Sequence, residues 1–142
     1  VESFGGVEGR LQFVKEVNGI KIWNDNNATT PEATIAALTS LEKNIVLLCG
    51  GADKNVSLET IAEKINEVCK KVVLLKGTGS EKLKPLLKNF VEADSLEEAV
   101  KKAYELCVSG DNLLFSPMFA SFGMFNNEYE RNDLFLKIVD SL

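Results

Sequence analysis

The chain has 142 residues, 45% of them hydrophobic and 26% charged, which fits one compact domain with a sizeable core. Its 16 basic and 21 acidic residues give a net charge of -5, and no Lys/Arg cluster is interleaved with aromatic residues, so nucleic acid is excluded as the expected partner. Its apolar runs are far shorter than the roughly 20 residues that cross a bilayer, and no signal peptide is visible, so we expect a cytoplasmic protein with no membrane segment.

The chain contains no histidine, which removes Ser-His-Asp and Cys-His catalysis and the common histidine-containing zinc sites. Its three cysteines, Cys49, Cys69 and Cys107, lie in apolar strand-like or helical patterns. Their spacings fit neither a zinc site nor a disulfide framework. We interpret them as reduced core thiols and predict no metal site in the chain.

The first predicted element is a β-hairpin. Residues 11–17 and 20–23 have strand patterns, and the Asn18-Gly19 pair between them is a strong signal for a two-residue turn. A helix follows, for which Thr30 is the expected N-cap and Pro31 occupies a favoured first-turn position. Its apolar spacing predicts an end near Lys43.

The rest of the chain alternates between strands and helices. Strands are predicted at 45–49, 72–75, 90–93 and 112–115, and helices at 58–68, from Ser95 to about 107 and at 127–139, with a short helix interrupted around Pro85. Such alternation implies right-handed crossovers and a mostly parallel sheet covered on both faces. The predicted fold is therefore an α/β, Rossmann-like three-layer sandwich with the antiparallel hairpin at one edge of the sheet.

Ligands of such folds bind beyond the carboxyl ends of the strands, where four polar loops are predicted. The loop at 24–30 is the first candidate site, because it combines an acid, three amides and two hydroxyls in one strand-to-helix turn. The alternative is a capped helix start, which explains Thr30 but not Asp25, Asn26 and Asn27 together.

The other three loops have equally plain alternatives. In the loop at 50–54, Gly50-Gly51 would let the backbone approach a ligand while Lys54 offers a positive charge to an anion. The alternative is a tight turn with a solvated lysine. The loop at 77–80 lacks the full GxGxxG pattern, so we favour a plain strand-to-helix turn there. The apolar loop at 116–125, with two serines, suits a partly buried pocket or simple packing of its three phenylalanines.

No GxxxxGK[ST] phosphate loop occurs in the chain. Because ATP-dependent phosphoryl transfer needs such a loop and metal-binding carboxylates, this domain by itself is not expected to activate ATP.

The order of these loops resembles the C-terminal domain of the Mur ligases, especially the members that add D-glutamate to UDP-N-acetylmuramoyl-L-alanine. The matching residues are Arg10, Asn24-Asp25, Ala28-Thr29, 31–34, 50–54, Ser116-Pro117, 120–122, Met124-Phe125 and Arg131. The resemblance covers nearly the whole chain, and it implies that residues 1–142 are the amino-acid-binding domain of a three-domain cytoplasmic enzyme. The absent N-terminal and central domains would be its partners, and the central domain would hold the phosphate loop, most of the ATP and Mg²⁺.

The resemblance also implies site residues. The expected ATP-binding residues are Arg10, Asp25 and Asn27, with Asp25 accepting hydrogen bonds from ribose hydroxyls. The expected residues of the D-glutamate site are Thr29, Lys54, Ser121, the Phe122 backbone and Glu128. No catalytic residue is expected within the chain itself.

The chain departs from the family pattern at three places. It has Gly9-Arg10 for the usual His-Arg, Asn26-Asn27 for the usual Ser-Lys, and Glu128 for an aromatic residue. We hypothesise either a relocated cation or an altered amino-acid preference. Another ligase of the superfamily, such as a folylpolyglutamate synthase relative, and a standalone binding module remain the alternative interpretations.

Overall fold

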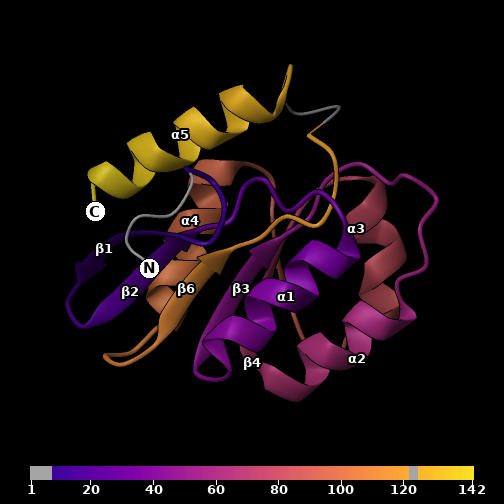
Figure 1. The fold of residues 1–142 in the computed structure, drawn as a ribbon, viewed down its shortest axis with the longest axis horizontal. Coiled ribbons are helices and arrows are strands. Elements are labelled where there is room, and N and C mark those ends of the chain that lie inside the picture. The colour runs from indigo at the N-terminus through magenta and orange to yellow at the C-terminus, as the bar shows by residue number, and fades with distance from the viewer. Residues whose placement is uncertain (1–7, 122–124) are drawn as a thin grey trace.

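The sheet of the protein has six strands in the order β1-β2-β6-β3-β4-β5, as seen in a computed structural model that describes residues 8–121 and 125–142 (Figure 1). All neighbouring strands are parallel except β1 and β2. The strands are β1 (Gln12–Val17), β2 (Ile20–Asn24), β3 (Ile45–Cys49), β4 (Cys69–Leu75), β5 (Val91–Ala93) and β6 (Asn112–Phe115).

The antiparallel pair β1-β2 is the predicted hairpin. Its turn residues Asn18 and Gly19 both have positive φ, at 51° and 79°, which is the backbone of a type I′ turn. Strand β1 lies at the edge of the sheet, while β2 pairs with β6. The position and the pairing of the hairpin are therefore confirmed.

Three of the helices begin at a side-chain cap. The hydroxyl of Thr30 accepts a hydrogen bond from the Ala33 N–H, and Ser95 and Asn127 cap their helices in the same way. The helices are α1 (Pro31–Leu41), α2 (Glu59–Val68), α3 (Thr78–Leu83), α4 (Leu96–Leu106) and α5 (Glu128–Asp140), and a 3₁₀ turn, η1 (Lys84–Leu86), follows α3.

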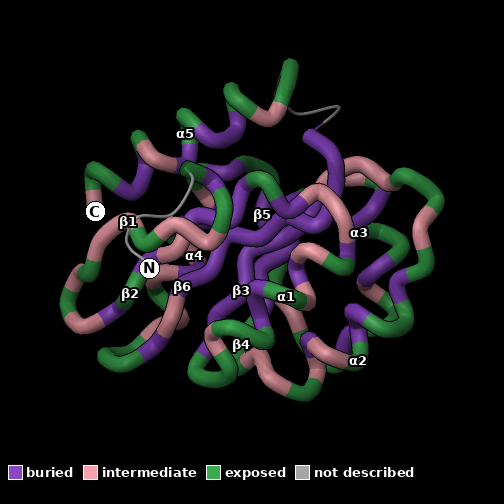
Figure 2. The backbone as a smooth tube through the Cα atoms, in the orientation of Figure 1, coloured by how far each residue is buried: buried purple, intermediate pink, exposed green. Residues whose placement is uncertain are grey.

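Helices cover both faces of the sheet, because each inner strand is apolar on both sides. Residues Val46 and Leu48 of β3 pack in one cluster with α4 and α5, and Ile45 and Leu47 pack in a second cluster with α1 and α2. Figure 2 shows these strands as buried chain between helices whose outer turns are exposed. The three-layer sandwich is confirmed.

Two boundaries differ from the sequence prediction. Strand β4 begins at Cys69, three residues before the apolar run at 72–75, because Cys69 and Lys71 already pair with Ile45 and Val46 of β3. The predicted turn at 77–80 is already helical from Thr78, and Gly79 packs so closely on Phe119 that a Cβ atom there would lie 2.5 Å from the ring. The segment after β4 therefore packs against the loops that follow β3 and β6, and its glycines allow this close approach.

The three cysteines are free thiols, with Cys49 buried and Cys69 and Cys107 half-buried. Burial raises the pKa of the Cys49 thiol far above its usual range and that of Cys69 to about 12. Such thiols stay protonated at neutral pH and are poor nucleophiles. None of the helices in the described ranges is long and apolar enough to cross a membrane.

Candidate functional site at the carboxyl ends of the strands

The loops that follow β2, β3, β4 and β6 meet at one edge of the sheet, where they line three neighbouring cavities. We name these cavities after one residue each. The Asp25 hollow measures about 400 Å³, the Thr29 hollow about 560 Å³ and the Ser121 cavity about 440 Å³. Ligand-sized cavities thus lie where the topology predicts them.

Asp25 is a buried carboxyl in the Asp25 hollow. Its Oδ1 accepts a hydrogen bond from the Leu11 N–H at 2.9 Å, and its Oδ2 accepts one from the Ser116 hydroxyl at 2.7 Å. Burial raises the pKa of Asp25 from 3.8 to about 6, although the hydrogen bonds from Ser116 and Leu11 act in the opposite direction. The predicted acid of the loop is therefore fixed in place and mostly ionised at neutral pH.

Arg10 and Asn27 line both the Asp25 hollow and the Thr29 hollow. The Asn27 N–H donates to the Gly9 carbonyl at 2.8 Å, and its side chain donates to the Glu8 carbonyl at 3.3 Å. Asn27 therefore holds the segment that carries Arg10. Because Arg10 is the arginine that the family pattern already has at this place, the relocated-cation hypothesis stays a prediction.

The Thr29 hollow brings Thr29 and Glu128 together with Arg10 and Asn27. The two groups of residues that the sequence assigned to separate ligands thus share one cavity. Glu128 forms no ion pair with Lys54 or Arg131 in the part of the chain that the structure describes. Its carboxylate stays available to this hollow.

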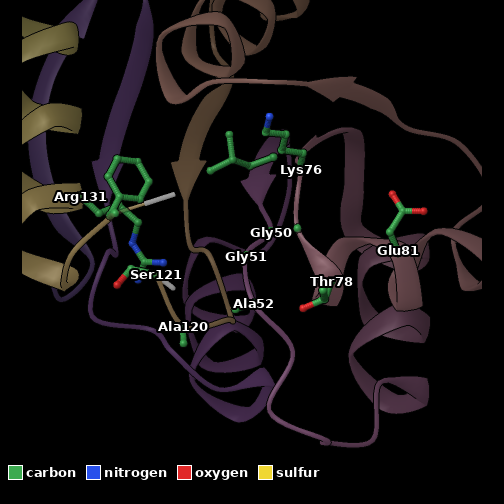
Figure 3. Close-up of a pocket in the computed structure, with 12 residues that line it drawn as sticks. Gly50, Gly51, Ala52, Lys76, Thr78, Glu81, Ala120, Ser121 and Arg131 are labelled. Atoms are coloured by element: carbon green, nitrogen blue, oxygen red, sulfur yellow. The ribbon is translucent and has the colours of Figure 1, made fainter. Parts of the chain in front are cut away.

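The Ser121 cavity lies between the loops that follow β3, β4 and β6 (Figure 3). Ser121 and Arg131 line one side of it, and Thr78 and Glu81 line the other. Gly51 has φ +154° and its Cβ would lie 2.5 Å from the Ala120 carbonyl oxygen. Only glycine lets the β3 loop approach the 116–121 segment this closely.

Two buried polar groups line this cavity, the hydroxyl of Ser121 and the guanidinium of Arg131. The Ser121 hydroxyl has no hydrogen-bond partner within residues 8–121 and 125–142. Arg131 is only 1% exposed, and no carboxylate of these residues forms an ion pair with it. Burial lowers the pKa of Arg131 to about 10, while the charge of Glu128 acts in the opposite direction. A buried hydroxyl and a buried guanidinium without a carboxylate partner favour binding of an anion.

Arg131 is held by three hydrogen bonds from its guanidinium. Nε donates to Asn26 Oδ1 at 2.7 Å, Nη2 donates to the Asn26 carbonyl at 3.1 Å, and Nη1 donates to the Phe119 carbonyl at 3.1 Å. A guanidinium has five N–H donors, so two remain for a ligand. Sequence analysis counted Arg131 among the residues that carry the resemblance and Asn26 in the 24–30 loop, but it did not predict the contact between them.

The structure places the remaining predicted residues as follows. Lys54 is exposed and lines none of the three cavities, whereas its neighbour Asp53 is held by Lys82 and by the Thr78 hydroxyl. Phe122 lies outside the described residues. Among the described residues no group of three or more acidic or cysteine side chains could hold a metal ion.

The sequence profile of the family described as "Mur ligase, glutamate ligase domain" matches residues 9–119. The chain belongs to this family. The matched range contains the Asp25 hollow, all the strands and the part of the Ser121 cavity that the loops after β3 and β4 line, whereas Ser121, Arg131 and the rest of α5 lie beyond it.

Curated relatives of this Mur ligase domain are named UDP-N-acetylmuramoylalanine–D-glutamate ligase. The protein from Roseiflexus sp. (strain RS-1) is 43% identical over 99% of the chain, and the one from Thermoanaerobacter sp. (strain X514) is 40% identical over 100% of it. The chain covers 32% and 33% of these two relatives, so it spans about a third of their length.

Solved structures share the fold of the domain. A MurF ligase from Thermotoga maritima in complex with ADP matches 98% of the chain and 32% of its own, with TM-score 0.67 and 21% identity. The E. coli FolC protein in complex with ADP, without folate substrate, matches 95% of the chain and 32% of its own, with TM-score 0.68 and 17% identity.

Proposed function

We propose that residues 1–142 are the amino-acid-binding C-terminal domain of an ATP-dependent ligase that adds D-glutamate to UDP-N-acetylmuramoyl-L-alanine. The observation that carries the proposal is the Ser121 cavity, where the buried Ser121 hydroxyl has no hydrogen-bond partner among the described residues and lies with the buried Arg131 guanidinium, so that the two can bind an anion. The names of relatives that are 40% to 43% identical to the chain support D-glutamate as that anion.

In the proposed reaction, the carboxylate of UDP-N-acetylmuramoyl-L-alanine attacks the γ-phosphorus of ATP, which gives an acyl phosphate and ADP. The amine of D-glutamate then attacks the acyl carbon, an amide bond forms, and inorganic phosphate leaves. Mg²⁺ would offset the phosphate charge from a site on the absent central domain. Because both substrates of the second step carry negative charge, the domain must supply donors that hold the amino acid at the acyl carbon.

The residues of this chain fit that division of work. Asp25 and Arg10 line the Asp25 hollow. There the Asp25 carboxylate would accept hydrogen bonds from the ribose hydroxyls of ATP, and the Arg10 guanidinium would bind its phosphates. Ser121 offers its hydroxyl to a carboxylate of the amino acid. Lys54 would join the site only when the loop after β3 moves or another domain closes over it, because it is exposed and outside the cavities.

The test is turnover by the full-length protein that carries this chain. With ATP, Mg²⁺ and UDP-N-acetylmuramoyl-L-alanine, release of ADP and formation of the amide should depend on D-glutamate. Formation of the amide with a different amino acid, and none with D-glutamate, would overturn the assignment of the substrate and support the altered preference.

A further inference from the structure

A contact between distant parts of the chain joins a residue of the Thr29 hollow to a residue of the Ser121 cavity. Asn26 lines the Thr29 hollow, and Arg131 lines the Ser121 cavity. The two residues are 105 positions apart in the sequence and are joined by two hydrogen bonds. Whatever fixes this contact also fixes the relative position of the two cavities.

The side-chain amide of Asn26 binds the first turn of α5 with both of its polar atoms. Its Oδ1 accepts from Arg131 Nε at 2.7 Å, and its Nδ2 donates to the Glu128 carbonyl at 3.0 Å. Asn26 is itself 1% exposed, and its N–H donates to Asn24 Oδ1 at 3.1 Å. The amide therefore has no freedom to rotate without leaving a buried donor or acceptor unpaired.

We propose that Asn26 is a positioning residue that acts through Arg131 and Glu128: it holds the start of α5 so that the amino acid lies at the right place beside the ATP site. The proposal rests on the proposed function. Asn26 itself faces neither reacting group, since its hydrogen-bonding atoms are used inside the protein.

A second contact supports this assignment of Asn26. Asn24 Nδ2 donates to Asn132 Oδ1 at 2.7 Å, so a second residue of the 24–27 segment also binds α5. Asn24 already anchors the helix, and loss of the Asn26 side chain should therefore shift the first turn locally without releasing α5 from the sheet.

The test compares Asn26→Ala with Asn112→Ala in the full-length protein. Asn112 is a matched control, because its amide also joins two segments: its Oδ1 accepts from Trp23 Nε1, and its Nδ2 donates to the Lys43 carbonyl. It lies at the amino end of β6, away from the three cavities. Asn26→Ala should lose more thermal stability than Asn112→Ala, because Asn26 and Arg131 are 1% exposed whereas Asn112 is half-buried. The KM for D-glutamate is the property that separates the two positions.

Asn26→Ala should raise the KM for D-glutamate about 10-fold or more, since a displaced charged donor costs about a factor of ten in binding. Asn112→Ala should leave this KM within about 2-fold of the parent. Equal KM values in the parent and Asn26→Ala, or an equal rise in Asn112→Ala, would overturn the proposal.

The variant Asn26→Asp carries the test if Asn26→Ala does not fold. Aspartate turns an oxygen towards the Glu128 carbonyl and gives Arg131 a carboxylate partner that competes with a bound anion, so the KM for D-glutamate should rise above that of the parent. An unchanged KM in Asn26→Asp would overturn the role of Glu128.

A double variant tests the path through Arg131. In an Arg131→Lys background, Asn26→Ala should raise the KM for D-glutamate far less than in the parent, because residues that act as a unit are not additive. If Asn26→Ala raised the KM for D-glutamate by the same factor in the Arg131→Lys background as in the parent, the proposal would be overturned. If the parent protein itself forms no amide with D-glutamate, the proposed function fails, whereas a failure of Asn26 alone leaves that function intact.

Discussion

Asp25 is expected to destabilise the folded chain at neutral pH, and Asp25→Asn should reveal this. Burial raises the pKa of Asp25 from 3.8 to about 6, so the folded chain holds a proton that the unfolded chain releases between these pH values. Each tenfold difference in proton affinity is worth about 1.4 kcal/mol, which gives a penalty of about 3 kcal/mol. The penalty is absent below pH 3.8 and complete above pH 6.

Asparagine should remove this penalty while the hydrogen bonds stay satisfied. Its oxygen can accept from the Leu11 N–H, as Asp25 Oδ1 does at 2.9 Å. Its NH₂ can donate to the Ser116 hydroxyl, which then donates to Thr34 Oγ1 at 2.9 Å. The structure therefore predicts that Asp25→Asn raises the free energy of unfolding by an amount that depends on pH. The variant also loses the carboxylate that we propose binds ATP.

The assay is urea unfolding of the chain and of Asp25→Asn at pH 3.5 and pH 7.5. At pH 7.5 the variant should be the more stable by up to about 3 kcal/mol, which moves the urea midpoint by about 1 to 2 M. At pH 3.5 the two proteins should have nearly the same free energy of unfolding. Asp133→Asn, at an exposed position of α5, controls for the same change of net charge. If the difference in the free energy of unfolding were the same at the two pH values, the raised pKa of Asp25 would not be its cause.

The remaining predictions concern the cavities and the proposed partner domains. Ser121→Ala should raise the KM for D-glutamate about 10-fold in the full-length protein with little loss of thermal stability, because its hydroxyl has no partner in the described residues; a large loss of stability with an unchanged KM would contradict this. Lys54→Ala should raise the same KM about 10-fold or more, and no change would remove Lys54 from the site. Gly51→Ala should lower the melting temperature, since its Cβ would lie 2.5 Å from the Ala120 carbonyl oxygen; an unchanged melting temperature would show that the β3 loop yields easily. The purified chain of residues 1–142 should hydrolyse no ATP, and measurable turnover would show that the other domains are not needed.

Local signals in the sequence were sufficient for the fold. The Asn18-Gly19 turn and the Thr30 cap with Pro31 depend on residues close in the chain, and the structure has both where they were predicted. The alternation of strands and helices then determined the sheet, and the sheet determined which loops converge. The start of β4 was missed, since Lys70 and Lys71 carry no apolar signal.

The site was predictable only in part. Topology placed Asp25 and Ser121 at the correct edge of the sheet, and the structure adds that they lie in different cavities. The contact between Asn26 and Arg131 was not predictable, because a buried amide that binds a helix 105 residues away has the same local sequence pattern as a solvated loop. The roles of Lys54 and Glu128 remain predictions from the resemblance.

The most direct test of the proposed amino-acid site is a crystal structure of the full-length protein with ADP and D-glutamate. We predict that the ribose lies at Asp25 and that a carboxylate of D-glutamate lies within hydrogen-bond distance of Ser121 Oγ, on the other side of the contact between Asn26 and Arg131. D-Glutamate bound elsewhere, with the Ser121 hydroxyl still without a hydrogen-bond partner, would show that the Ser121 cavity is not the amino-acid site.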